Sequence, residues 1–165
     1  MRPYFVTTSV FKRIWVFDEP EYRSMVQECF EDKIGRLFLR MVAYVIMPNH
    51  CHFVIETHNR FQIGRIMQHL KGYSGHMFKK KFPKVIEGME HDRLWTRRYH
   101  AVELKDDAAL QRSVIYIINN PARANLNPDQ FSLMISGKPT IDRELAPRSL
   151  PWGSMAQRCD RPIGG

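Results

Sequence analysis

Hydrophobic and polar positions at the start of the chain change from strand spacing to helical spacing. The segment Tyr4–Val10 is rich in β-branched and aromatic residues and predicts a strand. Positions 25, 26, 29, 30 and 34 are apolar at helical spacing. They predict a helix that Asp18 caps, that carries Pro20 in its first turn and that runs to about Ile34.

The middle of the chain predicts a hairpin followed by a second helix. Leu37–Met47 and His50–Glu56 have the composition of strands, and Pro48-Asn49 between them is a turn signal. From Phe61 to Lys81 the apolar positions return to helical spacing. Glycines at positions 64, 72 and 75 weaken this helix by about 1 kcal/mol each relative to alanine.

The last third of the chain predicts one strand, one helix and a tail. Leu94–Leu104 reads as a fourth strand. An aspartate at position 106 or 107 caps the next helix, which we expect to end near Asn120 because Pro121 disfavours helix in the residue before it. After about Ser136 the chain is rich in proline and glycine, which predicts a tail that lies on the domain or is disordered.

The order of these elements predicts an α+β fold. A hairpin between two helices makes the sheet mostly antiparallel, with helices packed on it, in a ferredoxin-like arrangement. We expect a single domain over residues 1–135 and a Pro/Gly-rich C-terminal tail over residues 136–165.

Composition narrows the function. With 165 residues and 44% hydrophobic content, the chain suits one domain with a real core. A formal net charge of +8 favours a polyanionic partner such as DNA, RNA or an anionic membrane. The three cysteines form no CxxC pair, which favours a reducing cytoplasm over a disulfide framework or zinc knuckle. The N-terminus does not resemble a signal peptide, and the longest apolar run, Met41–Pro48, is too short to span a bilayer, so we expect no membrane partner.

Two histidines follow the hairpin turn. On a strand His50 and His52 point to the same side, about 6–7 Å apart at Cα, and could share one metal ion. Cys51 and Phe53 point the other way, towards a core, so a His-Cys-His metal site is geometrically poor. The alternative is that they are two surface or hydrogen-bonded histidines with no metal.

The last helix carries a polar stripe beside its apolar face. Tyr116 lies outside the apolar arc, and Asn120 follows one turn later, so the phenol and the amide lie side by side. The alternative is a tyrosine that packs at the helix edge and an asparagine that only ends the helix before Pro121.

These motifs together resemble a known family. The stretch PNHCH resembles the His-hydrophobic-His motif of the HUH endonucleases, and Tyr116–Pro121 resembles the nucleophile segment of the single-tyrosine transposases, in particular the REP-associated tyrosine transposases. The resemblance covers roughly residues 3–126. Cys51 departs from the pattern, because the family usually has a larger apolar residue there.

The resemblance implies an HUH-type transposase domain over residues 1–135 that cleaves single-stranded DNA through a covalent 5′-phosphotyrosine. His50 and His52 would bind a divalent metal, Mg²⁺ or Mn²⁺, with Tyr116 as the nucleophile. Asn120 stands where the family has a polar third ligand. The implied partner is REP-like hairpin DNA, and the protein would be a monomer or a homodimer.

Basic and aromatic residues provide candidate DNA contacts. Cations that could hold phosphates are Arg65, Lys71, Lys79, Lys80, Arg97 and Arg98. Tyr73, Tyr99 or Trp95 could stack on unpaired bases. For each of them the alternative is a solvated surface position or, for the aromatic residues, a place in the core.

Two other functions fit parts of the pattern. A non-catalytic module could bind single strands by stacking alone, and it would show neither metal dependence nor a covalent adduct. A metallohydrolase of small phosphoesters would need further ligands; Glu56 shares the strand face of the histidines, but the sequence has no HExxH motif or aspartate cluster.

Overall fold

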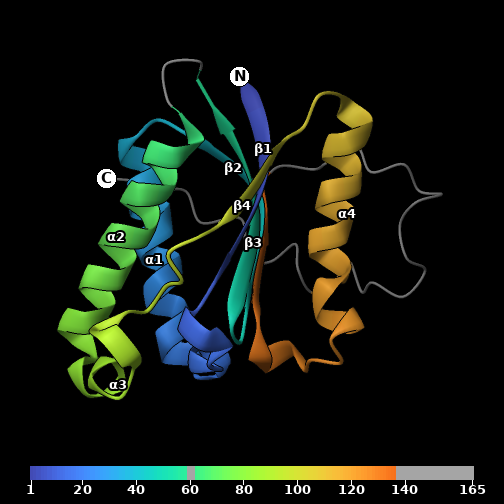
Figure 1. The fold of residues 1–165 in the computed structure, drawn as a ribbon. Coiled ribbons are helices and arrows are strands. Elements are labelled where there is room, and N and C mark those ends of the chain that lie inside the picture. Colours follow the sequence, from blue (N-terminus) through green and yellow to red (C-terminus); the bar gives the residue numbers. More distant parts are fainter. Residues whose placement is uncertain (59–61, 137–165) are drawn as a thin grey trace, which may run out of the picture.

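A five-stranded sheet lies at the centre of the computed structural model, which describes residues 1–58 and 62–136 (Figure 1). Its strand order is β4-β1-β3-β2-β5, and every neighbouring pair is antiparallel. The strands are β1 (Arg2–Ser9), β2 (Arg40–Met47), β3 (His50–Thr57), β4 (His100–Glu103) and β5 (Ser132–Ile135). The first four strands have the ferredoxin-like order, so the predicted α+β fold class is confirmed.

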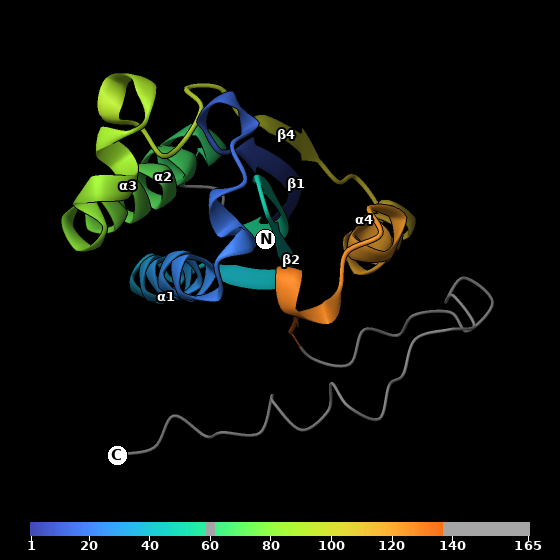
Figure 2. The same cartoon turned by 90° about the horizontal axis from the view of Figure 1, so that it is seen from below.

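Helices cover both faces of the sheet. Seen from below in Figure 2, α1 and α2 lie on one side and α4 lies on the other. The helices are α1 (Pro20–Arg36), α2 (Ile63–Lys81), the short α3 (Pro83–Glu87) and α4 (Asp107–Arg123). Within the described residues, no helix is long and apolar enough to cross a membrane.

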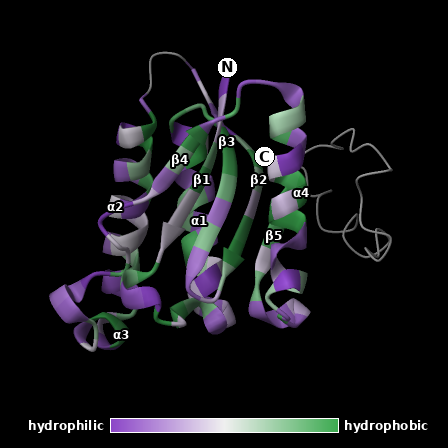
Figure 3. Cartoon of the chain, turned by 45° about the vertical axis from the view of Figure 1, so that its right-hand side comes forward, coloured by the Kyte–Doolittle hydropathy of each residue, from purple (hydrophilic) through white to green (hydrophobic). Residues whose placement is uncertain are grey.

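The two faces of β3 lead into separate halves of the core. Cys51, Phe53 and Ile55 are fully buried in the half that α1 and α2 cover. Val54 belongs to the half under α4, together with Ile117 of that helix. Figure 3 shows the hydrophobic colours gathered on the sheet and on the helix sides that face it. Alternation along β3 therefore turns its histidines towards α4.

Three predicted helix boundaries differ from the structure. Glu19, rather than Asp18, is the N-cap of α1, and the Asp18 carboxylate instead accepts a hydrogen bond from Gln130 at 3.1 Å. The helix also continues two residues beyond Ile34, to Arg36. The second helix begins at Ile63, and Phe61, where we predicted its start, lies outside the described residues.

The strand predicted over Leu94–Leu104 is wrong over most of its length. Only His100–Glu103 pairs with β1, and Trp95 makes an isolated bridge to Val10. Between them, the carbonyl oxygens of residues 96, 97 and 98 accept hydrogen bonds from the Lys71 ammonium. Lys71 holds this segment against α2, although the Thr96 amide still donates to the Ser9 carbonyl of β1 at 2.9 Å.

The C-terminal part of the described chain also differs from the prediction. Helix α4 does not end at Asn120 but continues through Pro121 to Arg123. Pro121 is buried, and packing of its ring offsets the loss of one backbone hydrogen bond. Strand β5, which we did not predict, extends the sheet beside β2. The predicted tail lies outside the described residues from residue 137 onwards.

Candidate catalytic site

The two histidines lie at the start of the central strand and face each other. In the ladder, His50 and His52 stand opposite Ser9 and Thr7 of β1. Their Nε2 atoms are 3.1 Å apart, and His52 is only 6% exposed. Cys51 points to the other face, as the strand alternation predicts, and is fully buried there. The pair therefore presents two imidazole nitrogens to one point in space.

Each imidazole is held by an oxygen atom at its other nitrogen. Nδ1 of His50 donates to Oδ1 of Asn49 over 2.6 Å, because a carbonyl oxygen can only accept. Nε2 of His50 consequently carries a lone pair. Nδ1 of His52 lies 2.8 Å from the Thr7 hydroxyl, which can donate or accept. Thr7 therefore suits either tautomer of His52, including the one that leaves both Nε2 atoms as electron-pair donors.

Burial keeps both imidazoles uncharged. Desolvation, together with the positive charge of nearby Arg13, lowers the pKa of His50 to about 4. Desolvation, together with His50 and Arg13, lowers the pKa of His52 to about 3. Neutral imidazole is the form that binds metal ions, so the pair is ready for a cation at neutral pH.

Tyr116 reaches this pair from α4. The apolar side of α4, which includes Val114 and Ile117, packs on the sheet and leaves Tyr116 at the helix edge with 38% of its surface exposed. The Tyr116 ring lies 5.2 Å from the His52 ring and 5.6 Å from the Phe5 ring, centroid to centroid. One chain thus brings together the strand histidines and the helix tyrosine.

The donor set suits a metal that needs further ligands. Among residues 1–58 and 62–136, no group of three His, Cys, Asp or Glu side chains is placed to hold a metal ion. Glu56, on the same strand, forms an ion pair with Arg40 at 2.6 Å. Asn120 is half-buried on the same line of α4 as Tyr116, one turn further on, and stays the predicted third ligand. Two neutral imidazoles with facing lone pairs fit a divalent cation whose remaining positions are open.

The sequence analysis missed two cations that lie near the site. Arg13 lies in the turn after β1, where residues 12 and 13 both have left-handed backbone angles (φ of 53° and 55°). That turn adjoins the histidines, because the Val10 amide donates to the Asn49 carbonyl at 2.9 Å. Arg112 precedes Tyr116 by one helical turn and lines a hollow of about 260 Å³ beside the tyrosine. Only the folded chain brings Arg13 to the histidines, whereas helical spacing alone places Arg112 beside Tyr116.

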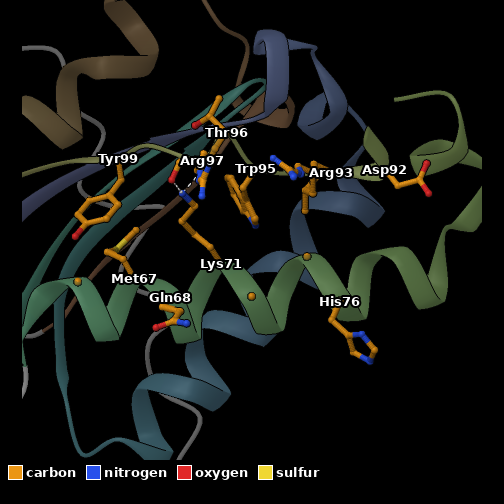
Figure 4. Close-up of a pocket in the computed structure, with 14 residues that line it drawn as sticks. Met67, Gln68, Lys71, His76, Asp92, Arg93, Trp95, Thr96, Arg97 and Tyr99 are labelled. Carbon is orange, nitrogen blue, oxygen red and sulfur yellow. Dashed lines mark hydrogen bonds between the residues drawn. The ribbon is translucent and has the colours of Figure 1, made fainter. Parts of the chain in front are cut away.

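The predicted DNA-binding cations have different surroundings. Arg97 and Lys71 line a groove beside α2 (Figure 4). The Lys71 ammonium is engaged there by three backbone carbonyls at 2.7, 3.1 and 3.3 Å. Lys79 pairs with Asp92 at 3.0 Å. The others are exposed on α2 or in the loop before β4: Arg65, Lys80 and Arg98.

The three candidate stacking residues also differ in exposure. Trp95 is 5% exposed, stacks on Phe30 and donates its indole N–H to Ser74, so it belongs mainly to the core. Tyr73 is half-buried, with the Lys33 ammonium 4.1 Å from its ring centroid. Tyr99 is 37% exposed. Of these three, Tyr99 is the one available to an incoming base.

Comparison with known proteins shows which family the chain belongs to. A solved REP-associated tyrosine transposase bound to a REP hairpin has a similar fold, with a TM-score of 0.61, 16% identity, and coverage of 76% of this chain and 70% of that chain. A candidate transposase from Deinococcus radiodurans matches with a TM-score of 0.58 and 18% identity, over 76% of this chain and 92% of that chain. No curated protein sequence matches significantly. The family model described as "Transposase IS200 like" matches residues 4–120, and the chain therefore belongs to the IS200-like transposase family.

Proposed function

We propose that this transposase nicks and rejoins single-stranded DNA through a covalent 5′-phosphotyrosine at Tyr116. The observation that carries the proposal is the contact between Tyr116 and His52, whose Nε2 atom is 3.1 Å from that of His50. Because the nucleophile's ring contacts a ring of the metal-binding pair, the tyrosine and the metal can act on the same phosphate. A module that only stacks on bases has no need of this arrangement.

Each residue has a defined part in the proposed reaction. Tyr116 Oη attacks phosphorus and loses its proton to solvent, while the P–O3′ bond breaks and the leaving oxygen takes up a proton as the 3′-hydroxyl. His50 and His52, completed by Asn120, would hold Mg²⁺ or Mn²⁺, which neutralises charge on the phosphate and polarises the P–O bond. Thr7 and Asn49 fix the two imidazole rings.

The covalent link explains how the strand can be rejoined. The phosphotyrosine keeps the energy of the phosphodiester bond, so a 3′-hydroxyl can displace the Tyr116 oxygen without ATP. The partial exposure of Tyr116 gives DNA access to its oxygen. Arg13 and Arg112, which lie near the histidine pair and beside the tyrosine, are suited to hold phosphates on either side of the cut.

Hairpin DNA is the substrate we propose. The similar structure of a REP-associated tyrosine transposase was solved with a REP hairpin, and the fold is shared over 76% of this chain. The positive net charge of +8 supports a nucleic-acid partner independently of that comparison. We propose that the chain works in the cytoplasm, where such DNA is accessible.

The decisive test is a covalent adduct. Purified protein is incubated with single-stranded oligonucleotides that carry REP-like hairpins, with Mn²⁺ or Mg²⁺ and then with EDTA. We expect an adduct resistant to SDS with the wild type, which disappears with EDTA and in Tyr116→Phe. Mass spectrometry then assigns the modified residue. Cleavage by Tyr116→Phe at the wild-type rate would show that another residue is the nucleophile.

The metal assignment has its own variant. His50→Ala with His52→Ala should abolish both cleavage and Mn²⁺ binding measured by titration calorimetry. A matched control is His69→Ala, because His69 is exposed on α2, outside the site. If the double variant still cleaves in EDTA, the metal site is contradicted. The role of Tyr116 is then decided by the adduct assay with Tyr116→Phe alone.

A further inference from the structure

A groove of about 560 Å³ runs between α2 and the segment that leads into β4 (Figure 4). Its floor on the helix side contains three glycines, Gly64, Gly72 and Gly75. Apart from its chain neighbours and the adjoining backbone of α2, no heavy atom of the described residues lies within 4 Å of the place that a Cβ at Gly72 would take. The helix backbone is therefore open to close approach by a flat ligand.

The other wall combines an exposed ring with positive charge. Tyr99 lies against the helix, since a Cβ at Gly64 would be 3.3 Å from its hydroxyl oxygen, and 37% of the residue is exposed. Arg93 and Arg97 line the same groove and are exposed. The one acid in the lining, Asp92, is neutralised by Lys79. Among the described residues no acid pairs with these two arginines, and an aromatic face beside free positive charge is the combination that binds single-stranded nucleic acid.

Lys71 gives this groove a fixed shape. Its ammonium donates to three consecutive carbonyls of the wall, and it lies 5.6 Å from the Tyr99 ring centroid. Burial lowers its pKa, and the carbonyl oxygens supply the contacts that water would otherwise make. Lys71 therefore stabilises the wall of the groove, and we assign the phosphate contacts to Arg93 and Arg97. A groove that exists before binding loses little entropy when it is filled.

The groove begins close to the candidate catalytic site. The Thr96 amide in its wall donates to the Ser9 carbonyl at 2.9 Å, and Ser9 stands opposite His50 in the ladder. Two strand spacings, about 10 Å, thus separate the groove wall from the histidine strand. The groove lies on the α2 side of the sheet and Tyr116 on the α4 side, so a short stretch of single strand can pass from Tyr116 around the edge strand β4 into the groove.

We propose that this groove binds unpaired nucleotides of the same DNA strand that Tyr116 cuts. A base stacks on Tyr99 above the glycine floor, and the backbone follows Arg93 and Arg97. Paired bases are stacked inside a duplex and offer no free face to Tyr99, so the groove selects single-stranded DNA over duplex DNA. This inference rests on the proposed function, because it assigns the groove to the strand on which the catalytic site acts.

The test fills the groove without disturbing the fold. Gly72→Leu projects a side chain into open space. The matched control is Gly35→Leu, because the Cβ position of Gly35 on α1 is equally open apart from its chain neighbours and its own helix backbone. Fluorescence anisotropy measures binding of an oligothymidylate of about twelve nucleotides, a length within the range that such sites cover. A blunt, fully paired hairpin is the second probe.

The expected result is specific to single strands. Gly72→Leu should weaken oligothymidylate binding at least about tenfold, the loss expected when one stacked base is displaced, while Gly35→Leu and hairpin binding stay unchanged. Equal oligothymidylate affinity in both variants would overturn the inference. Should Gly72→Leu lose its circular dichroism signal, Tyr99→Leu takes its place, with the same tenfold loss expected and an unchanged affinity overturning the inference.

The adduct assay separates this inference from the proposed function. If the wild type forms the Tyr116 adduct but Gly72→Leu forms it with an unchanged KM for a hairpin with a single-stranded flank, only the groove is wrong. If the wild type forms no adduct but Gly72→Leu loses oligothymidylate affinity, the groove is right and the cleavage chemistry is wrong.

Discussion

Thr7 and Thr8 are consecutive residues of β1 whose side chains point to opposite faces of the sheet, and their hydroxyl groups have opposite surroundings. The Thr7 hydroxyl lies 2.8 Å from Nδ1 of His52. The Thr8 hydroxyl is buried and has no hydrogen-bond partner among the residues that the structure describes. At the scale of single residues, the Thr7 hydroxyl helps to orient His52, whereas burial of the Thr8 hydroxyl lowers the stability of the fold because its lost contacts with water are not replaced.

Thr7→Val keeps the shape of the side chain but removes the partner of His52. We expect Mn²⁺ affinity to fall by about tenfold, because partners that orient a metal-binding histidine typically contribute 10–100-fold. Titration calorimetry on the purified chain measures the change. An unaltered Kd would mean that the β3 backbone alone fixes the His52 ring.

Thr8→Val is the matched control, one residue along the same strand. It should leave Mn²⁺ affinity unchanged and raise the free energy of unfolding by about 1 kcal/mol, because it removes a buried polar atom without a partner. Urea denaturation measures the second effect.

At the scale of elements, α4 positions the nucleophile, and its first turn is well capped. The Asp106 carboxylate accepts a hydrogen bond from the Ala109 amide at 2.6 Å. By contrast, Glu19 at the start of α1 accepts no capping hydrogen bond within the described part of the chain. The helix that carries Tyr116 thus has the stronger local start signal, and the structure chooses Asp106 from the two aspartates that the sequence offered as caps.

Asp106→Ala removes this cap. We expect a loss of about 1 kcal/mol in the free energy of unfolding, the typical cost of losing an N-cap. Urea denaturation measures it. Asp107→Ala, at the first helical position, should cost less, because its carboxylate acts only through the helix dipole. Equal losses in both variants would contradict the assignment of Asp106 as the cap.

At the scale of the whole molecule, charge and topology act together. The chain carries a net charge of +8, and the ferredoxin-like order places the groove wall and the histidine strand on either side of β1. If Arg93 and Arg97 each neutralise one phosphate, the logarithm of oligothymidylate affinity falls with the logarithm of salt with a slope of about −1.4. Between 50 and 200 mM salt the affinity should then drop by about sevenfold.

Arg97→Gln should make that slope shallower by about 0.7, the contribution of one phosphate contact on a single strand. Arg36→Gln, which removes the same charge from the end of α1, should leave it unchanged. Anisotropy titrations at several salt concentrations provide both slopes. A wild-type slope near zero would mean that stacking carries the binding and that the arginines do not touch phosphate.

The sequence by itself determined the features that depend on neighbouring residues. Strand alternation placed His50 and His52 on one side and Cys51 on the other, and helical spacing put Tyr116 and Asn120 on one line. The order of elements was enough for the α+β, ferredoxin-like fold. These properties are local because the backbone repeat alone sets the direction of each side chain.

Only the tertiary structure decided what depends on contacts between distant segments. Lys71 holds residues 96–98, part of a predicted strand, against α2, and packing carries α4 through Pro121. The partner of His52, Thr7, comes from a neighbouring strand 45 residues away in the sequence. The groove exists because glycines of α2 face a later segment of the chain, Gly75 facing Trp95 and Gly64 facing Tyr99. The hydrophobic periodicity of the sequence does not predict these tertiary contacts, because they depend on how the helices pack on the sheet once it has formed.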